Sequence, residues 1–171
     1  MKRGATACAY LVGIATTVVL AGCTTSAPVY GLRPVHPQAR VELWGPRVAF
    51  ARVASLRPTL RWESFPTEDD TKADHEGLLG RIHNVTYDLK VFHAEHKFPT
   101  GPIYVRRGLS AASHRLETPL KLSTKYFWTV RARFELDGRP RATPWGRIDH
   151  AWSTDLLVPS PFYYGLETPA K

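Results

Sequence analysis

The sequence predicts an all-β protein built as an antiparallel β-sandwich. No window after residue 23 shows the sustained 3.6-residue apolar period of a surface helix. Several short windows alternate with period two instead, and turn-forming motifs such as Pro99-Thr100-Gly101-Pro102 and Asp137-Gly138 stand near them. Short alternating strands separated by turns are typical of two antiparallel sheets packed face to face.

Three windows carry this alternation. The clearest runs from residue 126 to 135, where one set of side chains is mostly apolar: Tyr126, Trp128, Val130, Ala132 and Phe134. A second window has Val85, Tyr87, Leu89 and Val91 on one face, and a shorter one has Leu60 and Trp62. Because successive side chains of a strand point to opposite faces, these residues are the predicted core.

The same windows resemble the fibronectin type III domain over residues 44 to 154. Pro58-Thr59-Leu60-Arg61-Trp62 resembles its second strand with the buried tryptophan, and Tyr87-Asp88-Leu89-Lys90-Val91 its third. Leu120, six residues before Tyr126, is similar to the tyrosine corner, in which the tyrosine hydroxyl bonds upstream backbone. Residues 145 to 154 resemble the closing strand. Leu122-Ser123 replaces the usual proline-glycine and the 66–84 connection is long, so an immunoglobulin-like sandwich of other topology stays open.

The N-terminal segment predicts export and lipidation. Lys2 and Arg3 form a positive region before a mostly apolar stretch from residue 5 to 20, followed by Leu20-Ala21-Gly22-Cys23. These four residues resemble the lipobox of bacterial lipoprotein precursors, which implies cleavage before Cys23 and covalent lipid on its thiol. The alternative is a retained transmembrane anchor, but the stretch is shorter than the roughly 20 apolar residues that a spanning helix needs.

These features divide the chain into four parts: a signal peptide (1–22), lipidated Cys23 with an extended tether (23–43), the sandwich (44–154) and a C-terminal tail (155–171). Cys8 leaves with the signal peptide, so the mature domain has no disulfide and must be stable by packing. The residue after Cys23 is Thr24 and not an aspartate. Resemblance to lipoproteins without an aspartate at this position favours location of the protein at the outer membrane.

Loss of residues 1–22 would lower the net charge from +8 to +6, and this charge is spread along the chain without a run of five or six cations. A positive charge favours anionic neighbours, which for an exported protein are phospholipid head groups, lipopolysaccharide or cell-wall polymer. Nucleic acid is a poor candidate there. The alternative interpretation is an arginine-rich solvated surface with no specific partner.

No catalytic or metal-binding signature stands out, so the sequence predicts a protein that is not an enzyme and has no cofactor besides the lipid on Cys23. The acidic connection holds Glu68-Asp69-Asp70, Asp74 and Glu76, but lacks the spacing of a calcium loop and is interpreted as a solvated loop. A turn of helix is expected there around His75 to Leu79. His93 and His96 would point to opposite faces of a continuing strand, which does not suit a metal.

The predicted binding face lies on the outward positions of the third strand and of the 126–135 strand. Neighbouring strands would bring aromatic and basic side chains together on one exposed surface, the residue types that binding hot spots favour. The face comprises Lys90, Phe92, Phe127, Arg131 and Arg133. The alternative is that residues 159–165 fold back and cover it.

The function that follows is a membrane-anchored cell-envelope lipoprotein acting as a non-catalytic protein-interaction module, with an envelope protein as its partner, as in a subunit of an envelope assembly. The alternative is a lipoprotein that binds carbohydrate or cell-wall polymer through exposed aromatic rings, for which Trp44 and Trp145 are the tryptophans expected near an end of the sandwich.

Overall fold

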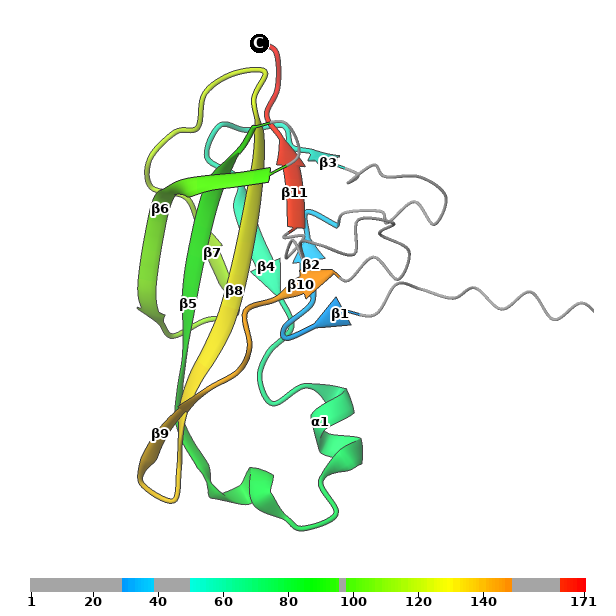
Figure 1. Ribbon diagram of the computed structural model, residues 1–171, viewed down its shortest axis with the longest axis vertical. Coiled ribbons are helices and arrows are strands. Elements are labelled where there is room, and N and C mark those ends of the chain that lie inside the picture. Colours follow the sequence, from blue (N-terminus) through cyan, green and yellow to red (C-terminus); the bar gives the residue numbers. More distant parts are fainter. Residues whose placement is uncertain (1–28, 39–49, 96–97, 149–163) are drawn as a thin grey trace, which may run out of the picture.

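The computed structural model describes residues 29–38, 50–95, 98–148 and 164–171. The predicted signal peptide, Cys23, Trp44 and His96 lie outside these residues. The described chain folds as an all-β sandwich, as predicted (Figure 1).

The larger sheet has six strands and contains the longest strands of the fold. Its order is β3 (Phe50–Arg52), β11 (Tyr164–Glu167), β8 (Lys125–Leu136), β5 (Ile82–Glu95) and β6 (Phe98–Leu109), with β9 (Arg139–Ala142) beside the far end of β8. All neighbours are antiparallel except β11 and β3, which run parallel. The predicted third strand and the predicted 126–135 strand are therefore central neighbours in this sheet.

A three-stranded sheet covers one face of the larger one. It consists of β2 (Pro34–His36), β4 (Thr59–Trp62) and β7 (Ser113–Arg115), in that order; in Figure 1, β7 lies behind β5 and β8, and β2 is drawn beside β10. A separate two-stranded pair joins β1 (Val29–Tyr30) to β10 (Arg147–Ile148).

The core lies between the two sheets and matches the predicted alternation. Trp62 is 3% exposed, and its ring meets the Tyr87 ring edge to face at 5.6 Å. Leu89 and Val130 face each other across β5 and β8, both fully buried. The strand period thus placed the apolar side chains on the correct face.

The hydrogen bond expected at Tyr126 is present. Its hydroxyl accepts from the Lys121 N–H at 2.9 Å, while the ring is 1% exposed and Leu120 is buried nearby in sequence. This bond ties the loop before β8 to the core, so the strand enters the sheet at a fixed point.

For the described residues, the edges of the sandwich differ in three places from the division of the chain expected from the sequence. The predicted tether contributes β1, β2 and the core residue Leu32, which is 1% exposed. The predicted tail contributes β11, whose Leu166 is fully buried. The predicted closing strand near residue 147 pairs with β1, because the place beside β8 belongs to β11; residues 149–154 lie outside the described chain.

The long connection carries two short helices. α1 (Glu68–Ala73) comes before the predicted position, and the 3₁₀ helix η1 (Leu78–Arg81) overlaps its end. Figure 1 shows both at the end of the molecule where β9 lies.

Candidate interaction face

The five residues of the predicted binding face share the outer face of the larger sheet. The register pairs Phe92 with Phe127 directly across β5 and β8, and the same face carries Lys90, Arg131 and Arg133 at alternate positions. The core residues occupy the opposite face. The predicted juxtaposition of these strands is confirmed.

The aromatic part of this face is buried, contrary to the predicted exposure. Phe92 is 8% exposed and Phe127 only 1%. The sheet continues past β8 through β11 and β3, and the Phe50 ring of β3 approaches the Phe127 ring to 5.2 Å. Gly165 of β11 is paired with Phe50 on one side and with Phe127 on the other, so no side chain separates these two rings. Of the expected covering segment, residues 159–163 lie outside the described chain, while Tyr164 and Gly165 form part of the sheet.

The basic part of the face is organised around Trp145. Its ring lies 4.4 Å from the Lys90 Nζ and 4.5 Å from the guanidinium carbon of Arg131. A cation that close to an indole face is attracted by the negative potential of the ring. Trp145 is half-buried, so this cluster is reached by solvent.

Backbone contacts with β8 hold Trp145 over the sheet. The Gly146 N–H donates to the Val130 carbonyl at 2.8 Å, and the Thr129 hydroxyl donates to the Gly146 carbonyl at 2.7 Å. A Cβ on Gly146 would meet the Leu32 carbonyl oxygen at 2.7 Å, so only glycine lets the chain pass here. The position of the indole is thus fixed by its neighbour.

A buried carboxylate lies under the cations. Asp88 is 1% exposed and accepts hydrogen bonds from the Arg131 Nε and Nη2 at 3.1 and 2.9 Å. Arg133 Nη1 is 3.9 Å from the same carboxylate. Burial of an unpaired carboxylate would be very costly, so the arginine offsets that cost. Three cations (Lys90, Arg131, Arg133) against one carboxylate leave the cluster with positive charge at the surface.

The acidic connection serves local structure. The Thr67 hydroxyl and Asp70 carboxylate form a reciprocal capping box at the start of α1, and Asp74 accepts from the Leu78 and Leu79 N–H groups at 2.7 and 3.0 Å. Glu68 pairs with Lys72 one turn on at 2.9 Å. Among the described residues no three potential ligands gather as a metal site would require.

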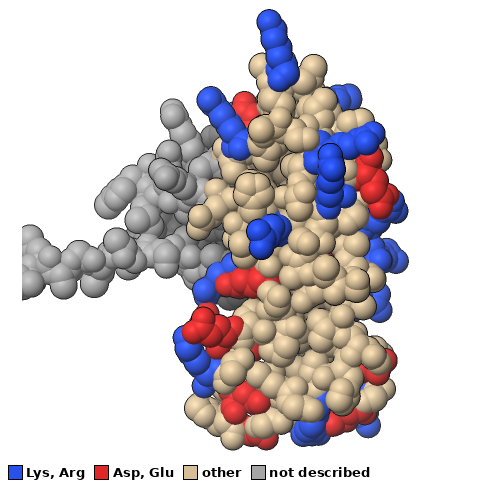
Figure 2. All heavy atoms as spheres, turned by 180° about the vertical axis from the view of Figure 1, so that it is seen from behind, with Lys and Arg blue, Asp and Glu red and all other residues tan. Residues whose placement is uncertain are grey.

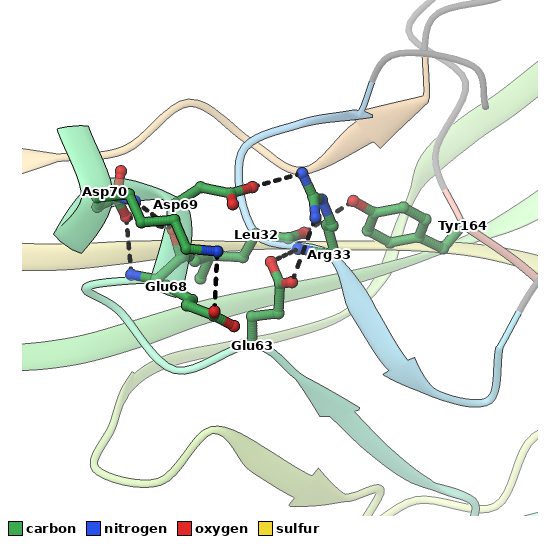
Figure 3. Close-up of polar contacts among 9 residues, drawn as sticks. Leu32, Arg33, Glu63, Glu68, Asp69, Asp70 and Tyr164 are labelled. Carbon is green, nitrogen blue, oxygen red and sulfur yellow. Dashed lines mark hydrogen bonds and ion pairs between the residues drawn. The ribbon is translucent and has the colours of Figure 1, made fainter. Parts of the chain in front are cut away.

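A second polar cluster, which sequence reasoning missed, joins the segment after β1 to the rest of the fold (Figure 3). Arg33 pairs with Asp69 of α1 at 2.8 Å and with Glu63 at 3.9 Å. The Tyr164 hydroxyl donates to the Leu32 carbonyl at 2.7 Å. Burial raises the pKa of Tyr164 and Glu63 raises it further, while Arg33 opposes them to a smaller extent. The phenol therefore stays neutral and acts as the hydrogen-bond donor to the Leu32 carbonyl.

One histidine is also linked to the larger sheet. His114 Nε2 lies 2.6 Å from the Tyr104 hydroxyl of β6. Burial lowers the pKa of His114, and the charge of Arg106 lowers it further. The neutral imidazole therefore bridges β7 and β6 as a structural contact.

Comparison of the chain with protein-family models, curated proteins and solved structures finds no match. Within the ranges that the structure describes, no helix is both long and apolar enough to span a membrane.

Proposed function

We propose that this chain is a cell-envelope lipoprotein, lipidated at Cys23, whose fibronectin type III-like sandwich is a non-catalytic protein-interaction module. The observation that carries the proposal is the cluster of Lys90, Arg131, Arg133 and half-buried Trp145 on the outer face of the larger sheet. Arginine and tryptophan are the residues on which binding energy most often concentrates. The partner that fits is an envelope protein with an acidic surface, as in a subunit of an outer-membrane assembly.

The buried Asp88 supports this proposal because it fixes Arg131 before any partner arrives. The guanidinium donates two hydrogen bonds to one carboxylate and lies against the indole, so little side-chain freedom is left to lose on binding. Arg133, with 49% of its side chain exposed, remains accessible to a partner carboxylate.

The anchor is tested by Cys23→Ser in the full chain, with metabolic labelling by a fatty acid. The variant should take up no label and keep its signal peptide, because only a thiol forms the thioether on which cleavage depends. Cys8→Ser is the matched control and should be labelled like the parent. Equal label in Cys23→Ser and the parent would remove the lipoprotein assignment.

The binding face is tested by crosslinking and pull-down from intact cells. Lys90→Glu with Arg133→Glu should reduce recovery of the partner, since the reversed charges repel an acidic surface. Arg139→Glu with Arg141→Glu, two exposed positions on β9, makes the same change in net charge and should leave recovery intact. If both pairs lose the partner equally, total charge and not this face decides binding.

The carbohydrate alternative has one observation in its favour. Among the tryptophans that the structure describes, Trp62 and Trp128 are buried, and Trp145 is partly exposed. An exposed indole can stack on a sugar ring. Retention of the parent, but not of Trp145→Ala, on isolated wall polymer would favour this function over the protein-interaction module.

A further inference from the structure

The small sheet presents a basic outer face on the side of the molecule away from the Trp145 cluster. Along β4 the burial alternates, so that Leu60 and Trp62 enter the core while Thr59 and Arg61 are exposed. The register places Arg115 of β7 opposite Thr59 and His36 of β2 opposite Arg61. Arg61 and Arg115 are therefore diagonal neighbours, with His36 beside them.

Neither arginine has an ion-pair partner among the carboxylates of the described residues. Arg33, Arg81, Arg106 and Arg131 each form ion pairs, whereas no ion pair joins Arg61 or Arg115 to another of the described residues. In Figure 2, which looks onto the side of the small sheet, basic residues gather toward one end and along one margin, and carboxylates are more frequent toward the other end. The small sheet thus has unbalanced positive charge.

The length of chain before β1 limits how far this face can lie from a membrane. Five residues lie between Cys23 and Val29, the first residue of β1, so six Cα-to-Cα steps join them. A fully extended chain of that length reaches about 20 Å. A sandwich held by lipid on Cys23 is therefore kept close to the bilayer surface. β2, the first strand of the small sheet along the chain, follows β1 after three residues.

We infer that the basic face of the small sheet, formed by His36, Arg61 and Arg115, docks on the anionic phospholipid head groups of the leaflet that holds the Cys23 lipid. This inference rests on the proposed lipid anchor and deepens the proposed function. Each arginine near an anionic surface increases binding about fivefold, and the attraction falls off within a Debye length of about 8 Å. Docking through this face leaves the Trp145 cluster directed away from the bilayer, toward a partner.

The test uses the mature lipidated protein, purified from cells that express the full chain and inserted into vesicles. Thr59→Cys introduces a thiol between the two arginines; Cys23 carries lipid and Cys8 leaves with the signal peptide, so a fluorophore attaches at one site. The probe is quenching by a nitroxide on the lipid head group. Vesicles contain either phosphatidylcholine alone or phosphatidylcholine with phosphatidylglycerol.

The label at Thr59→Cys should be quenched on the phosphatidylglycerol vesicles and not on phosphatidylcholine alone. Arg61→Gln with Arg115→Gln should lower the ratio of docked to undocked protein about 30-fold, and high salt should act in the same direction. Arg139→Gln with Arg141→Gln removes the same charge from β9 and should leave quenching unchanged. A label at Ala142→Cys should stay unquenched.

Equal quenching on both vesicle types, equal loss with both arginine pairs, or equal quenching at Thr59→Cys and Ala142→Cys would overturn the inference. So would binding of soluble wall polymer by this face together with no head-group quenching. Mass spectrometry separates the two levels of failure. A protein that carries its acyl chains and does not dock contradicts only this inference, whereas a protein without acyl chains contradicts the proposed anchor as well.

Discussion

The hydrogen bond from the Tyr164 hydroxyl to the Leu32 carbonyl joins two positions that lie 132 residues apart. Both side chains are buried in the core. Tyr164→Phe keeps the ring and removes the bond, and we expect a loss of about 1–3 kcal/mol in the free energy of unfolding, since the buried carbonyl loses its donor. Urea denaturation measures it. Tyr104→Phe, at a half-buried site, should cost less; an equal cost would show that burial of the bond is unimportant.

Alkaline pH should weaken the fold through the same phenol. Burial raises the pKa of Tyr164 above its ordinary value of 10.0. A group whose pKa is higher in the folded than in the unfolded state contributes its full stabilisation below the unfolded-state pKa. That contribution is lost as the pH rises from there through the folded-state pKa. Between pH 9 and 11 the parent should therefore lose about 1.4 kcal/mol more than Tyr164→Phe. Parallel pH profiles of the two proteins would contradict this assignment.

Trp62→Ala should cost about 3–5 kcal/mol, because it removes a large buried ring and leaves a cavity against Tyr87. That is a large part of the 5–15 kcal/mol that holds an ordinary domain. The urea midpoint of the variant should fall markedly. Thr59→Ala on the outer face of the same strand should change stability by no more than about 0.5 kcal/mol, and a similar fall in both variants would place Trp62 outside the core.

Asp88 and Arg131 should be coupled. In a double-mutant cycle with Asp88→Asn and Arg131→Gln, we expect a coupling energy of about 0.5–3 kcal/mol, because the carboxylate is 1% exposed and accepts two bonds from the guanidinium. The exposed pair Glu68 and Lys72 provides the comparison and should couple by about 0.3–0.5 kcal/mol. Equal coupling in the two cycles would mean that solvent reaches Asp88.

The sequence predicts those parts of the fold whose signal is local. The alternation around Trp62 and Tyr126 identifies core strands without knowledge of their partners, because each face of a strand is defined by its own period. The resemblance of Leu120 and Tyr126 to the tyrosine corner also implies a bond that closes over a few residues, and that bond is present.

The missed parts depend on distant pairing. β1, β2 and β11 have two to four residues each, too few to show a period, and their place in the fold is fixed by partners far along the chain. The strand phase likewise predicts which face Phe127 occupies, but its burial depends on Phe50 and on the position of Gly165 between them. The direction of a side chain is therefore predictable from the strand period, whereas the residues that pack over it are not.

The parallel pairing of β11 with β3 determines the order in which the sandwich can be completed. Among the described strands β3 pairs only with β11, which is the last of them to be synthesised. Until residue 167 is available, β8 has an open edge there and β3 has no strand to join. This arrangement delays closure of the sheet until β11 has been synthesised, so the edge at β8 closes only after β5, β6 and β9 are already available.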